Sequence, residues 1–279
     1  MLEALGRKFG EGEARSLTGI IFEELMHYSA VDVLLRGGHD LPEVIDGELP
    51  KVLGRLLANE PVQYVFGVAE FHGHRFKVTP ATLIPRPETA ELVDMIVDEH
   101  KEAADLRVLD IGTGSGCIAV SLARALKYAE VYALDISEAA LEVAAENARE
   151  LKTRVKFFKS DVLKSSQLPV DELDIIVSNP PYICEEEKAA MDGNVLDYEP
   201  HGALFVPNDE PLLFYRAIAR QAAKSLRPGG RLYLEINSRF AEETRQMLES
   251  EGFADVEVHL DFYSRPRFIT SSRDIRYRY

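Results

Sequence analysis

From residue 107 onward, strand-like and helix-like segments alternate along the chain. Short apolar runs typical of buried strands occur at 107–111, 131–135, 155–158, 173–177 and 231–236. Segments with helical spacing of apolar residues occur at 117–126, 138–150, 211–226 and 240–251. Two further strands are expected near 255–260 and 266–271. This alternation predicts an α/β fold with a doubly wound, mostly parallel seven-stranded sheet that an antiparallel hairpin closes.

The earlier part of the chain has a different pattern. Apolar residues recur at helical spacing over 13–27, and Pro50 suits the first turn of another helix. Residues 68–78 alternate in the manner of a hairpin, and a helix is expected over 87–100. In the first ~60 residues, no cluster of polar side chains suggests a catalytic site.

These patterns predict two domains. The first is a small N-terminal helical domain over residues 1–75, which would dock a partner, followed by a hairpin linker to about residue 86. The second covers residues 87–279 and contains the sheet.

Charge and cysteine content exclude several classes of protein. The chain carries a net charge of −15, whereas proteins that bind bare nucleic acid usually present a basic face, so a nucleic-acid partner is not expected. Only two cysteines occur, Cys117 and Cys184, far apart and without Cys-x-x-Cys spacing, which excludes a disulfide framework and a thiolate zinc site. His72 and His74 share one strand face without a third ligand nearby, so no metal is expected.

The same composition argues against a membrane protein. No apolar run approaches the ~20 residues that a membrane-spanning helix needs, and the first residues do not resemble a secretory signal. We therefore expect a cytoplasmic protein that does not associate with membranes.

The first strand of the alternating region ends in an acidic residue and a glycine-rich turn. Asp110 is followed, after Ile111, by Gly112, Thr113, Gly114, Ser115 and Gly116. Glycine lets the backbone turn sharply and approach a ligand closely. The spacing differs from the Gly-x-Gly-x-x-Gly of dinucleotide sites. A carboxylate two positions before the first glycine can meet the cationic amino-acid end of S-adenosylmethionine, whereas it would repel a pyrophosphate.

Two later strands also end in acidic residues. Asp135, with Ile136 beside it, follows the second strand, where a carboxylate accepts hydrogen bonds from the two ribose hydroxyls of an adenosine ligand. Asp161 and Val162 follow the third strand. There a carboxylate can accept the adenine amino hydrogens while the valine covers the ring. We therefore predict that these residues and the glycine turn bind the cofactor S-adenosylmethionine.

The fourth strand ends in Asn179-Pro180-Pro181-Tyr182. Such a run is unsuited to a strand or helix, because proline lacks an N–H and restricts the residue before it. An amide nitrogen is a poor nucleophile, so a methylating site must hold both of its hydrogens and aim the lone pair at the sulfonium methyl. The Asn179 side-chain oxygen and the Pro180 carbonyl can accept these hydrogens, and Tyr182 can stack on the planar group. We predict that this loop is catalytic, binds the substrate and contributes Asn179 to the cofactor site.

Over nearly its whole length the chain resembles the HemK/PrmC family, the glutamine N5-methyltransferases of peptide-chain release factors. Besides the two loops, the resemblance rests on Gln63–Gly67, Leu83–Thr89 and Asp197–His201. It implies a class I methyltransferase sheet at 87–279 with an N-terminal substrate-docking domain. It also implies S-adenosylmethionine as the cofactor and, as the substrate, the glutamine of the Gly-Gly-Gln loop in release factors.

The chain departs from the family pattern mainly after the catalytic loop. Ala90 stands where the family usually has an acid, and Gly202 where it usually has leucine. Val206-Pro207-Asn208 replaces a turn that contains two glycines, and Asn237 replaces a glycine after the sixth strand.

Two alternatives to protein-glutamine methylation remain open from the sequence. Methyltransferases that act on the amino nitrogen of adenine or guanine in DNA or RNA use a closely similar Asn-Pro-Pro-aromatic loop, although the acidic charge disfavours this function. A cofactor-binding regulatory module without activity is the other alternative, and the intact loop at 179–182 argues against it.

Overall fold

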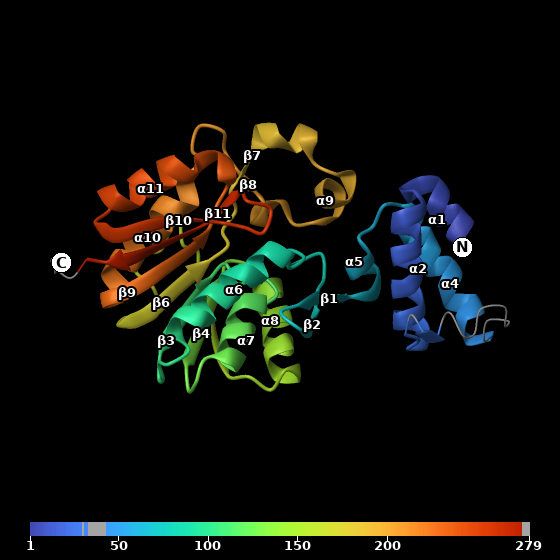
Figure 1. The fold of residues 1–279 in the computed structure, drawn as a ribbon, viewed down its shortest axis with the longest axis horizontal. Helices are drawn as coiled ribbons and strands as arrows, with labels where there is room; N and C mark the ends of the chain where they lie inside the picture. Colours follow the sequence, from blue (N-terminus) through green and yellow to red (C-terminus); the bar gives the residue numbers. More distant parts are fainter. Residues whose placement is uncertain (30, 33–42, 275–279) are drawn as a thin grey trace. The chain divides into compact units, whose positions relative to one another are not determined.

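The computed structural model describes residues 1–29, 31–32 and 43–274. The chain forms two compact units (Figure 1). One consists of Met1–Gly67 together with Asp192–Tyr198, and the other of the remaining residues. We expected the helical domain to extend to about residue 75. The structure divides the chain earlier and adds a later segment to the first unit. Residues 30, 33–42 and 275–279 of the expected domains lie outside the described residues.

The larger unit is built on a seven-stranded sheet with the order β10-β11-β9-β6-β3-β4-β5. Its strands are β3 (Arg107–Ile111), β4 (Glu130–Asp135), β5 (Val155–Lys159), β6 (Leu173–Ser178), β9 (Leu226–Glu235), β10 (Phe253–Leu260) and β11 (Pro266–Arg273). The first five are parallel, whereas β11 pairs antiparallel with both β9 and β10. The predicted doubly wound, mostly parallel sheet with an antiparallel hairpin at its edge is confirmed.

The strand order reverses at β3. From β3 the sheet continues to β4 and β5 on one side, and to β6 and β9 on the other. Ile111, the last residue of β3, pairs with Leu134 of β4 and with Ser178 of β6. In sheets of this kind, ligands bind beyond the carboxyl ends of the strands at such a reversal. The residues that follow Ile111, Leu134 and Ser178 therefore meet where a ligand is expected.

Helices cover both faces of this sheet (Figure 1). On one face are α6 (Pro87–His100), α7 (Cys117–Ala125) and α8 (Glu138–Glu150), and on the other are α10 (Leu213–Ser225) and α11 (Ala241–Ser250). Successive strand side chains point to opposite faces, so Val108 packs in one core and Leu109 in the other. This burial on both faces explains why the parallel strands are continuous apolar runs. None of the described helices is long and apolar enough to cross a membrane.

The hairpin of β1 (Val68–Phe71) and β2 (His74–Lys77) belongs to the larger unit. Phe71 and Phe76 are buried in the core under α6 and α7. Asn147 of α8 accepts a hydrogen bond from the Lys77 backbone N–H at 2.7 Å and donates to the Lys77 carbonyl at 3.0 Å. Asn147 also donates to the Ser115 carbonyl at 2.8 Å, so one buried amide joins the hairpin, α8 and the glycine turn.

The smaller unit contains α1 (Leu2–Phe9), α2 (Glu11–Met26), α4 (Glu43–Leu57), α5 (Val62–Phe66) and α9 (Gly193–Tyr198). Its core includes Leu5, Ala14, Leu17, Ile21, Val52, Leu56 and Val65. The Arg55 guanidinium joins α4 to α5, because it donates to the carbonyls of Tyr64 and Val65 at 3.0 and 2.7 Å. The Tyr198 hydroxyl donates to the Ala58 carbonyl at 2.8 Å, which attaches α9 to the end of α4.

The expectation that Pro50 begins a helix is wrong. Pro50 lies inside α4, which starts at Glu43. Ile45 and Val52 are buried and Leu49 is partly buried, so an apolar stripe continues past the proline. Burial of that stripe outweighs the loss of one backbone hydrogen bond that a proline within a helix imposes.

The segment after β6 forms structure that the sequence did not predict. β7 (Ile183–Cys184) and β8 (Phe205–Val206) pair as a short parallel ribbon. Between them lie the 3-10 helix Glu185–Ala190, α9 and a second 3-10 helix, His201–Ala203. The segment 179–182 is thus followed by an ordered excursion in place of a simple turn.

We predict that Asn147→Ala destabilises the larger unit. The substitution leaves the buried Ser115 carbonyl and the half-buried Lys77 N–H and carbonyl without this partner, and a buried unsatisfied group costs about 1–3 kcal/mol. Urea unfolding should show a loss of about 3 kcal/mol or more. Glu142→Ala, an exposed change on the same helix, should stay within about 0.5 kcal/mol of the unsubstituted protein. Equal effects of the two changes would contradict this role.

Candidate active site

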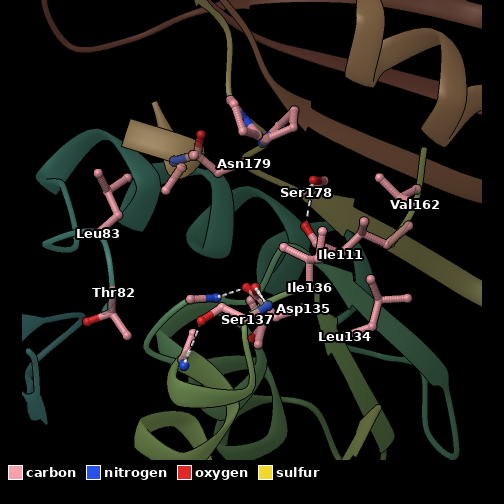
Figure 2. Close-up of a pocket in the computed structure, with 18 of the residues that line it drawn as sticks. Thr82, Leu83, Ile111, Leu134, Asp135, Ile136, Ser137, Val162, Ser178 and Asn179 are labelled. Carbon is pink, nitrogen blue, oxygen red and sulfur yellow. Dashed lines mark hydrogen bonds between the residues drawn. The ribbon is translucent and has the colours of Figure 1, made fainter. Parts of the chain in front are cut away.

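A cavity of about 600 Å³ opens beyond the carboxyl ends of β3, β4, β5 and β6. A volume of this size suits a cofactor or a drug-sized ligand. Its lining includes the turn 112–115, Asp135 to Ser137, Ser160 to Lys164 and Ser178 to Pro181. In the view of Figure 2, Asp135 and Asn179 lie at opposite ends of the space. Most of the residues that the sequence singled out are therefore brought to one cavity.

The glycine turn has the backbone conformation that only glycine adopts easily. Gly112, Gly114 and Gly116 have φ angles of 74°, 54° and 80°. A Cβ on Gly116 would lie 3.0 Å from the Ala144 Cβ, so this glycine also permits α7 to pack against α8. The turn therefore presents its backbone to the cavity while the following helix stays close to the sheet.

Asp135 is held at the end of β4 by two backbone donors. Gly114 N–H donates to one carboxylate oxygen and Ser137 N–H to the other, each at 2.9 Å. Burial raises the pKa of Asp135, and these hydrogen bonds oppose the rise. Each oxygen keeps an acceptor site, because a carboxylate can accept about four hydrogen bonds. The fixed carboxylate can accept from two neighbouring ribose hydroxyls.

Asp110 is placed differently from Asp135. Its side chain is fully buried, accepts a hydrogen bond from the Thr113 hydroxyl at 2.6 Å, and is not among the residues that line the cavity. Burial raises the pKa of Asp110 to about 7, and the bond from Thr113 partly offsets this rise. The hydrogen bond between Thr113 and Asp110 holds the glycine turn from its buried side. Direct contact of Asp110 with a cofactor stays a prediction.

Asp161, Val162 and Ile136 form the remaining part of the cofactor end. Asp161 accepts from the Leu163 N–H at 2.9 Å and pairs with Lys164 at 2.9 Å, and the bond from Lys164 lowers the pKa of Asp161. Ile136 is 60% exposed although it is a large apolar residue. Val162 and Ile136 both border the cavity (Figure 2), so a flat apolar ring between them would be covered on its faces. The set of residues present fits S-adenosylmethionine.

The Asn-Pro-Pro-Tyr loop begins directly after β6. Asn179, Pro180 and Pro181 line the cavity, and the Ser178 hydroxyl before them is bonded to the Ile111 carbonyl at 2.6 Å. Tyr182 is not in the lining, and its hydroxyl donates to Glu235 at 3.0 Å. The stacking of Tyr182 on a substrate amide stays a prediction.

Comparison with known proteins identifies the family. A model of the methyltransferase small domain matches residues 89–196. The release factor glutamine methyltransferase of Bacteroides thetaiotaomicron is 46% identical over 261 residues, which cover 94% of this chain and 93% of that protein. The release factor glutamine methyltransferase of Flavobacterium psychrophilum is 41% identical over 271 residues, which cover 96% and 95%. The chain belongs to the release factor glutamine methyltransferase family.

A solved structure supports the fold alone. The catalytic domain of hMettl16, crystallised with the MAT2A 3'UTR hairpin 6, has a TM-score of 0.57 at 18% identity and covers 77% of this chain and 78% of that chain. At this identity the likeness concerns the methyltransferase fold and carries no information on substrate. S-adenosylmethionine is the cofactor of this family of methyltransferases.

Two asparagines that the sequence analysis singled out, Asn237 and Asn208, contact the segment after the loop at 179–182. Asn237 donates to the Tyr182 carbonyl at 3.1 Å and to the Glu187 carboxylate at 3.0 Å. Asn208 accepts a hydrogen bond from the Glu186 N–H at 3.0 Å. A glycine has no side chain with which to form either set of bonds. In this member of the release factor glutamine methyltransferase family, the side chains of Asn237 and Asn208 therefore hold the segment from Tyr182 to Glu187.

Sequence reasoning gave no role to three buried residues, Glu199, Thr89 and Glu235. Glu199 is buried, pairs with Arg86 at 2.5 Å and accepts from the Ile84 N–H at 3.2 Å, which joins two segments on which the family resemblance rests. Thr89 and Glu235 contact Asn179 and Tyr182. The sequence contained a pattern that indicates Glu235, because this residue, like Asp135, is an acidic residue at the carboxyl end of a parallel strand.

The two histidines of the hairpin have partners of their own. His72 lies 2.9 Å from an Asp94 oxygen, and His74 accepts a hydrogen bond from Arg124 at 3.0 Å. Among the described residues, no group of three or more metal-ligating side chains is positioned to hold an ion.

We predict that Asp135→Ala weakens binding of S-adenosylmethionine. The change removes the acceptor for two ribose hydroxyls, and hydrogen bonds to a charged group contribute about 1.5–3 kcal/mol each. Titration calorimetry should therefore show at least about a tenfold loss of affinity. The control is Asp98→Ala, which removes one exposed carboxylate from α6 and so changes the net charge equally. Unchanged affinity in Asp135→Ala would show that the ribose is held elsewhere.

Proposed function

We propose that this protein transfers a methyl group from S-adenosylmethionine to the side-chain amide nitrogen, N5, of the glutamine in the Gly-Gly-Gln motif of peptide-chain release factors. The observation that carries the proposal is that Asn179 and Pro180 line the same cavity as Asp135 and the glycine turn, in a chain that matches release factor glutamine methyltransferases over 94% of its length. A site for the substrate amide thus adjoins a site for the methyl donor.

The residues of the loop orient the side-chain amide of the substrate glutamine. When bound, S-adenosylmethionine supplies a methyl group activated by its sulfonium. The Asn179 side-chain oxygen accepts one amide hydrogen of the substrate glutamine, and the Pro180 carbonyl accepts the other. The nitrogen lone pair is then perpendicular to the amide plane and faces the methyl group. Asn179 and Pro180 would thus hold the amide nitrogen for the methyl group that the bound cofactor would supply, and the proton that the methylated nitrogen loses would pass to water. Positioning of this kind can supply much of the rate acceleration.

The cofactor end is assigned residue by residue in the same proposal. Asp135 holds the ribose, and Ile136 and Val162 cover the adenine, whose amino group bonds to Asp161. The glycine turn lies along the amino-acid end of the cofactor, with Asp110 beneath it. The cavity lining supports this arrangement, and Asp110 acts through its hydrogen bond from Thr113 of the turn.

Methylation of an amino group in DNA or RNA is the alternative activity, because an exocyclic amino group is also planar and carries two hydrogens. The net charge of −15 favours a protein substrate, since phosphate binding depends on basic residues. A release-factor substrate would also place the enzyme in the cytoplasm, where translation takes place, without a membrane partner.

We predict that the purified protein transfers labelled methyl groups to a purified release factor and not to tRNA, rRNA or DNA. Asn179→Ala should lower this transfer by more than about tenfold, a barrier change of about 1.4 kcal/mol, because the substrate nitrogen loses its acceptor. Affinity for S-adenosylmethionine should change little. Preferred labelling of a nucleic acid would overturn the proposed substrate, and full activity of Asn179→Ala would overturn the proposed role of the loop.

The helical unit is proposed as the docking domain for the release factor. It has a core of its own, and none of those of its residues that the structure describes lines the cavity. The chain re-enters this unit for α9 shortly after the catalytic loop, and Tyr198 bonds to Ala58 there. A docking event at the helical unit would therefore act on a segment that is continuous in sequence with the loop.

We predict that deletion of residues 1–67 greatly reduces methylation of an intact release factor and spares binding of S-adenosylmethionine. A short Gly-Gly-Gln peptide offers the same amide but no docking surface, so its weak methylation should change much less. A cooperative thermal melt must first show that the truncated protein is folded. Equal losses on peptide and intact protein would mean that this unit shapes the active site and does not dock the substrate.

A further inference from the structure

A buried chain of hydrogen bonds lies behind Asn179. Its side-chain nitrogen donates to the Thr89 hydroxyl at 3.2 Å, and that hydroxyl donates to a Glu235 carboxylate oxygen at 2.7 Å. The other oxygen of Glu235 accepts from the Tyr182 hydroxyl at 3.0 Å. Thr89 is 2% exposed and Glu235 is 1% exposed. The chain links the start of α6, the end of β9 and both ends of the catalytic loop.

Glu235 determines which group donates and which accepts in each bond of this hydrogen-bond chain. A carboxylate only accepts hydrogen bonds, and a threonine hydroxyl has a single hydrogen to donate. Because Thr89 gives that hydrogen to Glu235, its oxygen can only accept from Asn179. The Asn179 amide must then turn its NH₂ group toward Thr89, and its oxygen is directed away from Thr89.

The direction matters because an asparagine amide has two ends of nearly the same shape. Its oxygen accepts hydrogen bonds, whereas its NH₂ group donates them. A substrate glutamine presents N–H hydrogens to the loop, so only one of the two orientations of Asn179 can bind it. In the reversed orientation, the NH₂ group of Asn179 and the N–H of the substrate would face each other as two donors.

The burial of Glu235 has no other evident use. Placing a carboxylate away from water is costly unless hydrogen bonds compensate for the lost hydration. Burial raises the pKa of Glu235, while the bonds from Thr89 and Tyr182 and the nearby Arg267 charge oppose the rise. The buried carboxylate of Glu235, at the end of β9, therefore accepts one hydrogen bond on each of its oxygens. One donor is the Tyr182 hydroxyl of the loop, and the other is the Thr89 hydroxyl, which contacts Asn179 of the loop.

We infer that Thr89 and Glu235 are positioning residues, which fix the side-chain amide of Asn179 in the orientation that accepts a hydrogen from the substrate nitrogen. The inference rests on the proposed function, since it concerns the same methyl transfer. Glu235 acts at a distance, through the Thr89 hydroxyl and the Tyr182 hydroxyl.

The first test is Thr89→Val, which keeps the shape of the side chain and removes the hydroxyl. With release factor as substrate, kcat should fall by about tenfold or more, because Asn179 is no longer held in one orientation. KM for the release factor and the affinity for S-adenosylmethionine should each change by less than about threefold, since neither depends mainly on this amide. Thr89→Ser, which restores a hydroxyl, should recover most of kcat.

Two further variants separate positioning from general damage. Thr244→Val makes the same change at a buried threonine of α11, outside the cavity, and should leave kcat unchanged. Thr89→Ala replaces Thr89→Val if the latter fails to fold. In the double variant Thr89→Val with Glu235→Met, kcat should be close to that of Glu235→Met alone, because both residues act through one chain.

The outcomes are distinguishable from a failure of the proposed function. If the unsubstituted protein does not methylate the release factor, the proposed function fails. If it does, and Thr89→Val keeps its full kcat, the inference about Thr89 is overturned. Multiplicative losses in the double variant, or a loss in Thr89→Ser as large as in Thr89→Val, would also overturn it. A rise in KM without a fall in kcat would assign Thr89 to substrate binding instead.

Discussion

The backbone pairing of β3 with its two neighbours fixes the candidate active site. Ile111 pairs with Leu134 on one side and with Ser178 on the other, so Gly112, Asp135 and Asn179 each follow at the same level of the sheet. Parallel strands bring their carboxyl ends to one edge. A change of register at either pairing would separate the proposed ribose carboxylate from the proposed substrate amide. The distance between the two ends of the cavity is thus set by backbone hydrogen bonds.

Buried polar side chains hold the loops that continue from this edge. Asn147 bonds to the glycine turn, and the Ser178 hydroxyl bonds to the end of β3. Thr89 and Glu235 do the same for the catalytic loop. Buried polar groups of this kind are costly unless all their bonds are made, and when made they select a single arrangement. The loops can therefore be rigid without regular secondary structure of their own.

Side-chain hydrogen bonds hold the segment that follows the loop at 179–182. Asn237 and Asn208 hold the region around Glu186 and Glu187 by side-chain bonds. The chain then enters the smaller unit as α9 before it returns. The loop at 179–182 is thus followed in the sequence by a segment that belongs to the proposed docking domain. The extra side-chain bonds stabilise its start without using residues that line the cofactor end of the cavity.

The sequence by itself determined the strands and helices of the larger unit and the chemistry at the strand ends. Apolar runs buried on both faces have a strong and local signal, so β3, β4 and β6 lie where they were expected. The same reasoning misplaced the start of α4, because a proline signal is local whereas the burial of Ile45 and Val52 depends on other helices. Only the tertiary structure decided that Asp110 lies beneath the turn and outside the cavity lining, and that Thr89 bonds to Glu235. The physical reason is that a side-chain hydrogen bond between distant elements depends on strand order and helix packing, which no local pattern of residues encodes.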